Sequence, residues 1–194
     1  HYDFIEQHSR SSQALVERYL KELSTDEELY TINIDGTDFY IPSPNLNALF
    51  LIMHSGSHFA AENISIRHLI DWMQFLRHYG DKVDWGRLLN FSDTFGFRPF
   101  LECLNSMCIN YLGMPEKMAC CTMKDEKIVK KAIEDVLKYK QKNIPNNFIK
   151  GWIFRFKRRF SNSWKQKMVY KDNQFFAFFR SFLTHIIHPK IWKK

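Results

Sequence analysis

The 194-residue sequence lacks long hydrophobic runs and has little glycine or proline. Its longest uninterrupted apolar stretch is the six-residue segment 48–53, whereas a helix that spans a bilayer needs about 20 apolar residues. Seven glycines and six prolines are too few for a collagen-like or low-complexity chain. These shortages argue against membrane-spanning and fibrous classes.

Cysteine is also scarce, and the four thiols follow neither a CxxC pattern nor the spacing of a disulfide framework. This usage favours the reducing cytosol, where cysteine behaves as a small buried hydrophobe. No signal-peptide pattern opens the chain. Because the sequence starts at His1 rather than at methionine, we expect it to be part of a longer protein or a processed product.

Hydrophobic residues make up 45% of the chain and aromatic residues 16%, which indicates a folded globular protein. Charge is divided unevenly along it. Residues 1–116 carry 8 Lys and Arg against 16 Asp and Glu, and residues 117–194 carry 20 against 5. Such asymmetry suggests two functional regions. The basic part can attract the acidic part, or it can form a surface for phosphate, nucleic acid or anionic lipid.

Hydrophobic periodicity predicts a mainly α-helical fold, a helical array with one small β-hairpin near the N-terminus. Residues 30–42 alternate around Asp35-Gly36, a pair that favours a two-residue type I′ turn. Asn45 is the expected N-cap of the first helix after the hairpin. In the second helix we expect an apolar face made of Ile66, Leu69, Ile70, Met73, Phe75 and Leu76. The predicted helices span residues 12–23, 45–61, 65–79, 84–95, 98–112 and 125–142.

Two regions follow from this pattern. Residues 1–115 form the hairpin and the helical core, and residues 116–194 form a basic, aromatic helical extension. Residues 148–194 alone hold 13 of the 31 aromatic residues.

The sequence lacks the common nucleotide-binding and hydrolase motifs, among them GxGxxG, GxxxxGK[ST], HExxH and GxSxG. Nor is any Gly-Ser pair followed by an Asp-x-Asp pair. A nucleotidyl-transfer site needs a turn of small residues for the triphosphate and paired carboxylates for two Mg²⁺ ions. Asp35 and Asp38 come nearest to such a pair, but they flank the hairpin turn, where a solvated role is the better interpretation.

The densest group of polar residues is His54-x-x-x-His58, followed by Arg67-His68 and Asp71-Trp72. A spacing of four puts His54 and His58 on one helical face. Together with His68 or Asp71 they can form a metal site, because zinc needs at least a third ligand. Alternatively, they pack between helices beside an Arg67–Asp71 ion pair. We favour the second interpretation and predict no catalytic and no metal-binding residue. The candidate substrate-binding residues are His54, His58, Arg67, Asp71 and Trp72.

A second group lies in residues 148–164, where a helical wheel places an aromatic stripe beside basic residues. Such a helix can complete a protein core. It can also lie on an anionic membrane or another polyanion. No RNA-recognition, KH or helix-turn-helix signature is present, so no specific nucleic acid partner is predicted. The candidate membrane-binding or polyanion-binding residues are Lys150, Trp152, Arg155, Lys157, Arg158 and Arg159.

Three segments resemble one bacterial family. They are Leu51-Ile52-Met53-His54-Ser55-Gly56-Ser57-His58-Phe59, then Ile66-Arg67-His68-Leu69-Ile70-Asp71-Trp72-Met73-Gln74-Phe75-Leu76, and then Val83-Asp84-Trp85. They match the patterns H-x-x-x-H-F, L-R-x-x-x-D-W-x-x-F-L and D-W of the uncharacterised nucleotidyltransferase family, with Ile66 in place of the usual Leu. The resemblance covers roughly residues 1–115. This family is common in Bacteroidetes and often encoded near surface-polysaccharide genes.

The resemblance implies that the catalytic core of the family lies upstream of His1, with the Mg²⁺ carboxylates and the NTP site. His1-Tyr2 resembles the end of the last strand of that core. The chain itself is then a helical accessory region on the acceptor side, inactive alone and without a cofactor of its own, and its partner is the upstream core. The alternative is a binding module whose basic aromatic tail engages anionic lipid or another polyanion. We expect a cytoplasmic protein, peripheral to the membrane under the second hypothesis.

Overall fold

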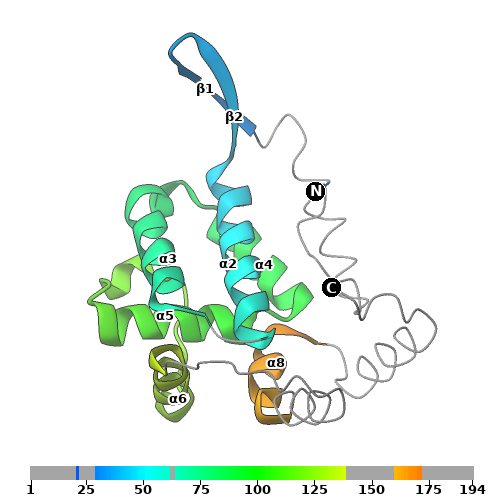
Figure 1. The fold of residues 1–194 in the computed structure, drawn as a ribbon, viewed down its shortest axis with the longest axis vertical. Coiled ribbons are helices and arrows are strands. Elements are labelled where there is room, and N and C mark those ends of the chain that lie inside the picture. The colour runs from blue at the N-terminus through cyan, green and yellow to red at the C-terminus, as the bar shows by residue number, and fades with distance from the viewer. Residues whose placement is uncertain (1–20, 22–28, 62–63, 139–159, 172–194) are drawn as a thin grey trace, which may run out of the picture.

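A computed structural model describes residues 21, 29–61, 64–138 and 160–171, and these form a mainly helical body with one β-hairpin, as the sequence predicts (Figure 1). Among these residues, no helix has the length and hydropathy needed to cross a bilayer. The elements in chain order are β1 (Leu29–Ile34), β2 (Thr37–Pro42), α2 (Pro44–Ala61), α3 (Ile66–Tyr79), the 3-10 turn η2 (Gly80–Lys82), α4 (Trp85–Phe95), α5 (Arg98–Leu112), the 3-10 turn η3 (Glu116–Met118), α6 (Glu126–Leu137) and α8 (Ser163–Val169).

The hairpin formed by β1 and β2 projects from one end of the helical body (Figure 1). Its strands pair antiparallel from Leu29↔Pro42 to Ile34↔Thr37, which leaves Asp35-Gly36 as a two-residue loop. The φ angles are 50° at Asp35 and 82° at Gly36. Positive φ at both positions is what a type I′ turn requires, so the prediction from the Asp-Gly pair is confirmed.

Helix α2 starts two residues earlier than an Asn45 N-cap predicts, because Ser43 and not Asn45 caps it. The Ser43 hydroxyl accepts a hydrogen bond from the Leu46 N–H at 3.1 Å, and Pro44 occupies the first helical position, where its missing N–H costs nothing. The Asn45 side chain serves a different purpose. Its Oδ1 accepts the Asp84 N–H at 2.7 Å and thereby joins the start of α2 to the start of α4.

In α3 the buried face differs from the predicted one. Ile66 and Ile70 were expected in the core but are 42% and 40% exposed. Trp72 is buried in their place, together with Leu69, Met73, Phe75 and Leu76. Helix α3 therefore turns its aromatic residues, rather than its isoleucines, toward α5.

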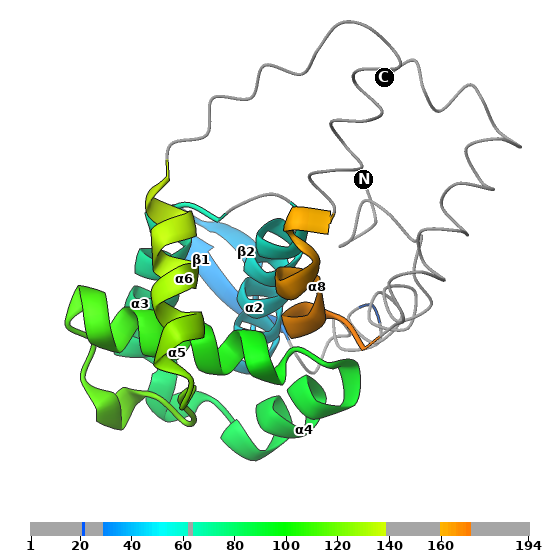
Figure 2. The same cartoon turned by 90° about the horizontal axis from the view of Figure 1, so that it is seen from below.

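The hydrophobic core is organised around α5, which contacts α3, α4, α6 and α8. Figure 2 shows α6 and α8 lying against α5, with α8 also next to α2. Six hydrophobic residues of α5 are inaccessible to solvent: Phe100, Leu101, Cys103, Leu104, Met107 and Cys108. Val129 and Ile133 of α6 and Met168 and Val169 of α8 belong to the same buried cluster.

Within the basic extension, the structure describes residues 116–138 and 160–171, which include η3, α6 and α8. Asp125 caps α6 by accepting the N–H groups of Lys127 and Ile128. The helix ends at Leu137, five residues short of the predicted end. In residues 160–171, a turn at Asn162 precedes α8. The helix predicted for residues 148–164 is therefore interrupted at Asn162.

A buried ion pair joins these two helices. The Lys165 ammonium of α8 bonds to the Asp135 carboxylate of α6, with the two side chains 1% and 14% exposed. The same ammonium lies 5.3 Å from the centre of the Phe59 ring on α2. Trp164 meets Phe59 edge to face at 5.5 Å. These contacts attach α8 to both α6 and α2.

Candidate functional site

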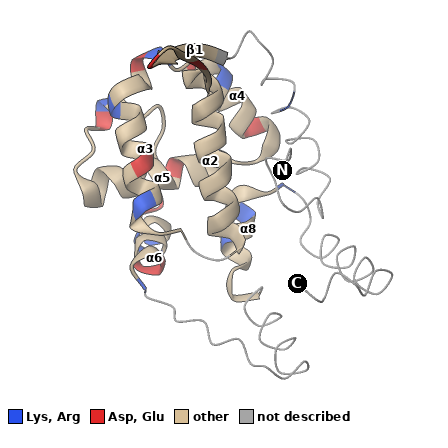
Figure 3. Ribbon diagram, turned by 45° about the horizontal axis from the view of Figure 1, so that its top comes forward, with Lys and Arg blue, Asp and Glu red and all other residues tan. Residues whose placement is uncertain are grey.

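Two histidines stand one helical turn apart on the outer face of α2. The His54 and His58 rings meet edge to face with centroids 4.6 Å apart, and both side chains are exposed. Within the described parts of the chain, neither ring has a hydrogen-bond partner. Helix α2 contains no Lys, Arg, Asp or Glu, as its uniform colour in Figure 3 shows. The two imidazoles are thus the ionisable groups of this helix.

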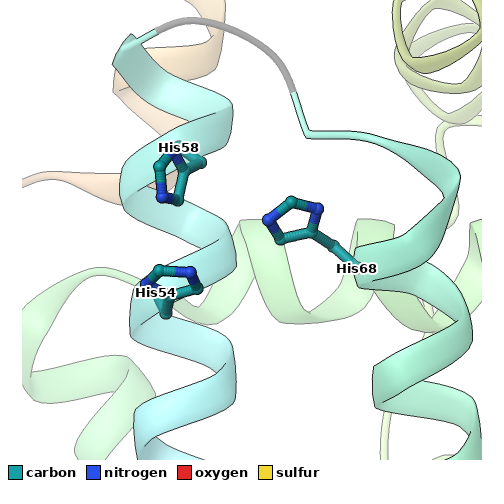
Figure 4. A group of neighbouring side chains, drawn as sticks. All are labelled: His54, His58 and His68. Atoms are coloured by element: carbon teal, nitrogen blue, oxygen red, sulfur yellow. The ribbon is translucent and has the colours of Figure 1, made fainter.

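A third histidine faces them from α3. His68 lies in the first turn of that helix, with its ring centroid 6.0 Å from His54 and 5.7 Å from His58. Figure 4 shows one of its ring nitrogens directed at the pair on α2. One nitrogen from each of the three residues lies within 4.8 Å of the others. We call these residues the histidine cluster.

Hydrogen bonds to the N-cap residue of α3 orient His68. Its Nδ1 accepts the Ser65 N–H at 3.2 Å and lies 3.1 Å from the Ser65 hydroxyl. Nδ1 is therefore engaged on the side of Ser65, and the nitrogen that faces α2 is Nε2. The Ser65 contacts thus hold the third imidazole in a defined orientation toward the pair.

The surroundings favour the neutral form of two of the three imidazoles. Burial lowers the pKa of His54 below its ordinary 6.5, and the neighbouring His58 and His68 lower it further. Burial and His58 also lower the pKa of His68. Ser65 and Asp71 raise this pKa and so offset part of the decrease. A neutral imidazole is the form that offers a nitrogen lone pair to a metal ion or a hydrogen-bond donor.

The other candidate residues of this region divide between surface and core. Arg67 and Asp71 form the expected ion pair on α3, at 3.7 Å, with side chains 85% and 52% exposed. Trp72 lies one turn beyond His68 but is buried, and its indole N–H donates to Asn105 Oδ1 on α5 at 2.9 Å. Arg67 and Asp71 thus lie near His68, which faces His54 and His58, whereas Trp72 is buried.

In the described residues, the Gly-Ser pair and the two aspartates of the hairpin lie in different elements. Gly56-Ser57 is the sequence's one Gly-Ser pair, and it lies inside α2. A Cβ at Gly56 would come within 3.2 Å of the Phe100 ring and 3.3 Å of the Phe97 ring. Gly56 therefore allows α2 to pack closely against Phe100 of α5 and against Phe97, the residue that precedes α5. Asp35 and Asp38 are exposed at the hairpin turn, where Asp38 accepts a hydrogen bond from Asn33 at 2.6 Å.

The candidate polyanion-binding residues lie outside the described residues. All of them fall within residues 139–159, so their role stays a prediction. The set consists of Lys150, Trp152, Arg155, Lys157, Arg158 and Arg159.

Sequence reasoning underrated two features of this region. His68 was only one of two alternative third ligands, because the spacing cannot show how α3 faces α2. Asn105 was not identified at all. It accepts the Trp72 indole N–H and donates to the Cys121 carbonyl at 2.9 Å. Its only sequence signal is an amide placed among the apolar and small residues of 103–109.

The model of one protein family, described as "uncharacterised nucleotidyltransferase", matches residues 2–113, which is more than half of the chain. That range includes the hairpin, α2 to α5 and the whole histidine cluster. No match was found among curated proteins or among solved structures. From the extent of the family match, together with the segments that carry His54, His58, Arg67 and Asp71, we conclude that the chain belongs to the uncharacterised nucleotidyltransferase family.

Proposed function

We propose that this chain is the acceptor-side helical region of a nucleotidyltransferase and that the residues handling the metal-bound triphosphate lie outside it. The family match supports the reaction class. The sequence supports placing the triphosphate-binding residues outside the chain, because no Gly-Ser pair in it precedes an Asp-x-Asp pair. A cytoplasmic location remains a prediction.

One observation carries the proposal. His54 and His58 of α2 face His68 of α3, and the exposed Arg67–Asp71 pair lies near His68 on the same helix. Gly56, between the two histidines in the sequence, instead faces Phe97 and Phe100 in the core. Exposed polar groups assembled from separate helices contribute little to folding, so a binding role is the simplest reason for their arrangement.

The chemistry of this surface suits a polar acceptor. Arg67 offers an exposed guanidinium, whose several N–H donors suit carboxylate or phosphate oxygens. The imidazoles can donate to or accept from a hydroxyl group. Because the resemblance associates this family with surface-polysaccharide genes, saccharides and saccharide phosphates are the acceptors to test first.

The division of labour is tested with the chain alone. The purified chain is incubated with Mg²⁺ and each of the four NTPs, and release of pyrophosphate is measured. We expect no turnover above a protein-free control. Sustained pyrophosphate release that depends on the chain would contradict the proposal.

The acceptor role is tested where a catalytic core is present, in the polypeptide or complex that contains it. We expect Arg67→Ala to raise the KM for the acceptor while the KM for the nucleotide stays unchanged. Arg77→Ala is the matched control, because Arg77 is also an exposed arginine of α3 but lies outside the family-like surface residues. Equal effects of the two substitutions would rule out a specific acceptor surface around Arg67.

A further inference from the structure

We propose that His54, His58 and His68 form a binding site for a divalent transition metal, Zn²⁺ in the first instance, with three imidazole ligands and an open coordination position. The inference goes beyond the proposed function and does not depend on it. The spacing of His54 and His58 predicted only two ligands on one helix. In the histidine cluster, His68 provides a third nitrogen from a separate helix.

The distances are close to those of a three-histidine site. Zinc–nitrogen bonds of about 2.0–2.1 Å in a tetrahedral arrangement place the ligand nitrogens about 3.3–3.4 Å apart. In this structure the three nitrogens lie within 4.8 Å of one another. Small rotations of the side chains close the difference, and the exposed positions of His54 and His58 leave room for them.

The cluster has no competing structural role for its two α2 members. In the described part of the chain, their contacts are with aromatic rings: His54 stacks on Phe50 at 5.6 Å and meets His58 at 4.6 Å. Three imidazoles so close together repel one another when protonated, so their proximity offers the fold no electrostatic gain. Coordination of one shared cation makes the same proximity favourable.

Ser65 supplies the outer contact that a metal-binding histidine needs. A ligating imidazole commonly donates its second ring N–H to an oxygen, which fixes its tautomer and orientation. When His68 binds through Nε2, its Nδ1 carries the proton. The Ser65 hydroxyl, 3.1 Å away, is then the acceptor. The bond from the Ser65 N–H to Nδ1 is exchanged for this one on metal binding.

The ligand type selects the metal. Imidazole nitrogens suit zinc, copper, nickel and iron, whereas magnesium and calcium prefer oxygen. Three protein ligands that face solvent leave a position for water or for an oxygen of a bound substrate, as in catalytic rather than structural zinc sites. Asp71 near His68 adds a negative charge to the surroundings, and Arg67 offsets it.

The test uses the full chain without an affinity tag, after treatment with a chelator. Co²⁺ is titrated first, because four-coordinate Co²⁺ has a strong visible absorption, and Zn²⁺ is then added as a competitor. We expect one Co²⁺ per chain with this absorption, its displacement by Zn²⁺, and a rise in melting temperature with Zn²⁺ concentration.

Single substitutions locate the site. His58→Gln and His68→Gln should each weaken Zn²⁺ binding by more than the about 10–100-fold typical of losing an outer contact, because each removes a ligand itself. His78→Gln is the matched control, since His78 is an exposed histidine of α3 whose Nδ1 lies 2.8 Å from the Gln74 carbonyl oxygen. All variants retain His1, His8, His185 and His188, so any binding by these residues cancels in the comparison.

Absence of Co²⁺ and Zn²⁺ binding by the unaltered chain would overturn the proposal. So would a His58→Gln or His68→Gln variant that binds as tightly as the His78→Gln control. Because His58 is exposed, its replacement leaves the core intact, and an unchanged far-ultraviolet circular dichroism spectrum verifies this for each variant.

Discussion

The buried side of the molecule and the α2–α3 surface use similar side chains in opposite ways. Asp135 and Lys165 form an ion pair with exposures of 14% and 1%, between helices far apart in the sequence. Arg67 and Asp71 form a pair on one helix, with exposures of 85% and 52%. The first pair is part of the packing, whereas the second lies in water.

This contrast indicates where function resides. Polar groups of the interior are matched to one another: Asp135 to Lys165, Trp72 to Asn105. Their identities follow from the need to satisfy buried donors and acceptors. The imidazoles of His54 and His58 have no comparable structural duty, so their presence on one surface points to a ligand. The following predictions test this comparison, from the largest expected effect to the smallest.

The thiols of the interior should be almost inert. Burial raises the pKa of Cys103 and Cys108 from the ordinary 9.0 to about 12. Three pKa units correspond to about a thousandfold lower thiolate fraction at a given pH well below both values, and thiolate is the reactive form. Alkylation of the native chain, followed by mass spectrometry, should therefore label Cys120 long before these two. A hydrogen bond with Cys121 lowers the pKa of Cys120, and its side chain is only half-buried. Rapid labelling of Cys103 would show that the interior around α5 is open.

The buried ion pair should be indispensable to stability. Asp135→Ala leaves the Lys165 ammonium uncompensated in the core, and breaking such a pair costs about 3–5 kcal/mol of unfolding free energy. Urea denaturation measures the loss. The double substitution Asp135→Leu with Lys165→Met should recover much of it, because no unpaired charge then remains. A change below 1 kcal/mol in Asp135→Ala would mean that the α6–α8 corner is not tightly packed.

Removal of the buried amide should have an intermediate effect. Asn105→Ala deprives the Trp72 indole N–H and the Cys121 carbonyl of their partner, and a buried unsatisfied polar group costs about 1–3 kcal/mol. The intrinsic fluorescence of Trp72 should change as well, and denaturation followed by fluorescence reports both effects. Asn110→Ala on the same helix is the control, because Asn110 is exposed.

The exposed ion pair should matter least. Asp71→Ala should lower the unfolding free energy by less than about 1 kcal/mol, as is typical of surface pairs. A half-buried pair would instead lose about 1–3 kcal/mol on the same substitution. Denaturation in low and high salt separates the two cases. A large loss that is insensitive to salt would remove the contrast between the two regions.

Local sequence patterns predicted the helices and the hairpin well, but they predicted poorly how these elements pack against one another. The Asp35-Gly36 turn is correct because backbone preferences at two adjacent residues decide it. Ser43 caps α2 instead of Asn45, because both residues are good caps and Asn45 finds a distant partner in Asp84. The exposure of Ile66 and Ile70 depends on how α3 is rotated against α5, which no periodicity within α3 determines.

The candidate site was predictable only in part, for the same reason. A spacing of four residues placed His54 and His58 on one face, and the Arg67–Asp71 pair formed as its spacing suggested. The approach of His68 depends on the path between α2 and α3, and the burial of Trp72 depends on Asn105, 33 residues away. The pairing of Asp135 with Lys165 spans 30 positions and left no local trace in the sequence.

The close packing at Gly56 bears on the orientation of the histidines on the opposite side of α2. Gly56 sits midway between His54 and His58 in the sequence and on the opposite side of the helix, where the two phenylalanine rings leave no room for a methyl group without adjustment. A larger residue there would require the Phe97 and Phe100 rings or α2 itself to move, and a movement of α2 would carry both imidazoles with it. The missing side chain at Gly56 thus allows the position of α2 that orients His54 and His58.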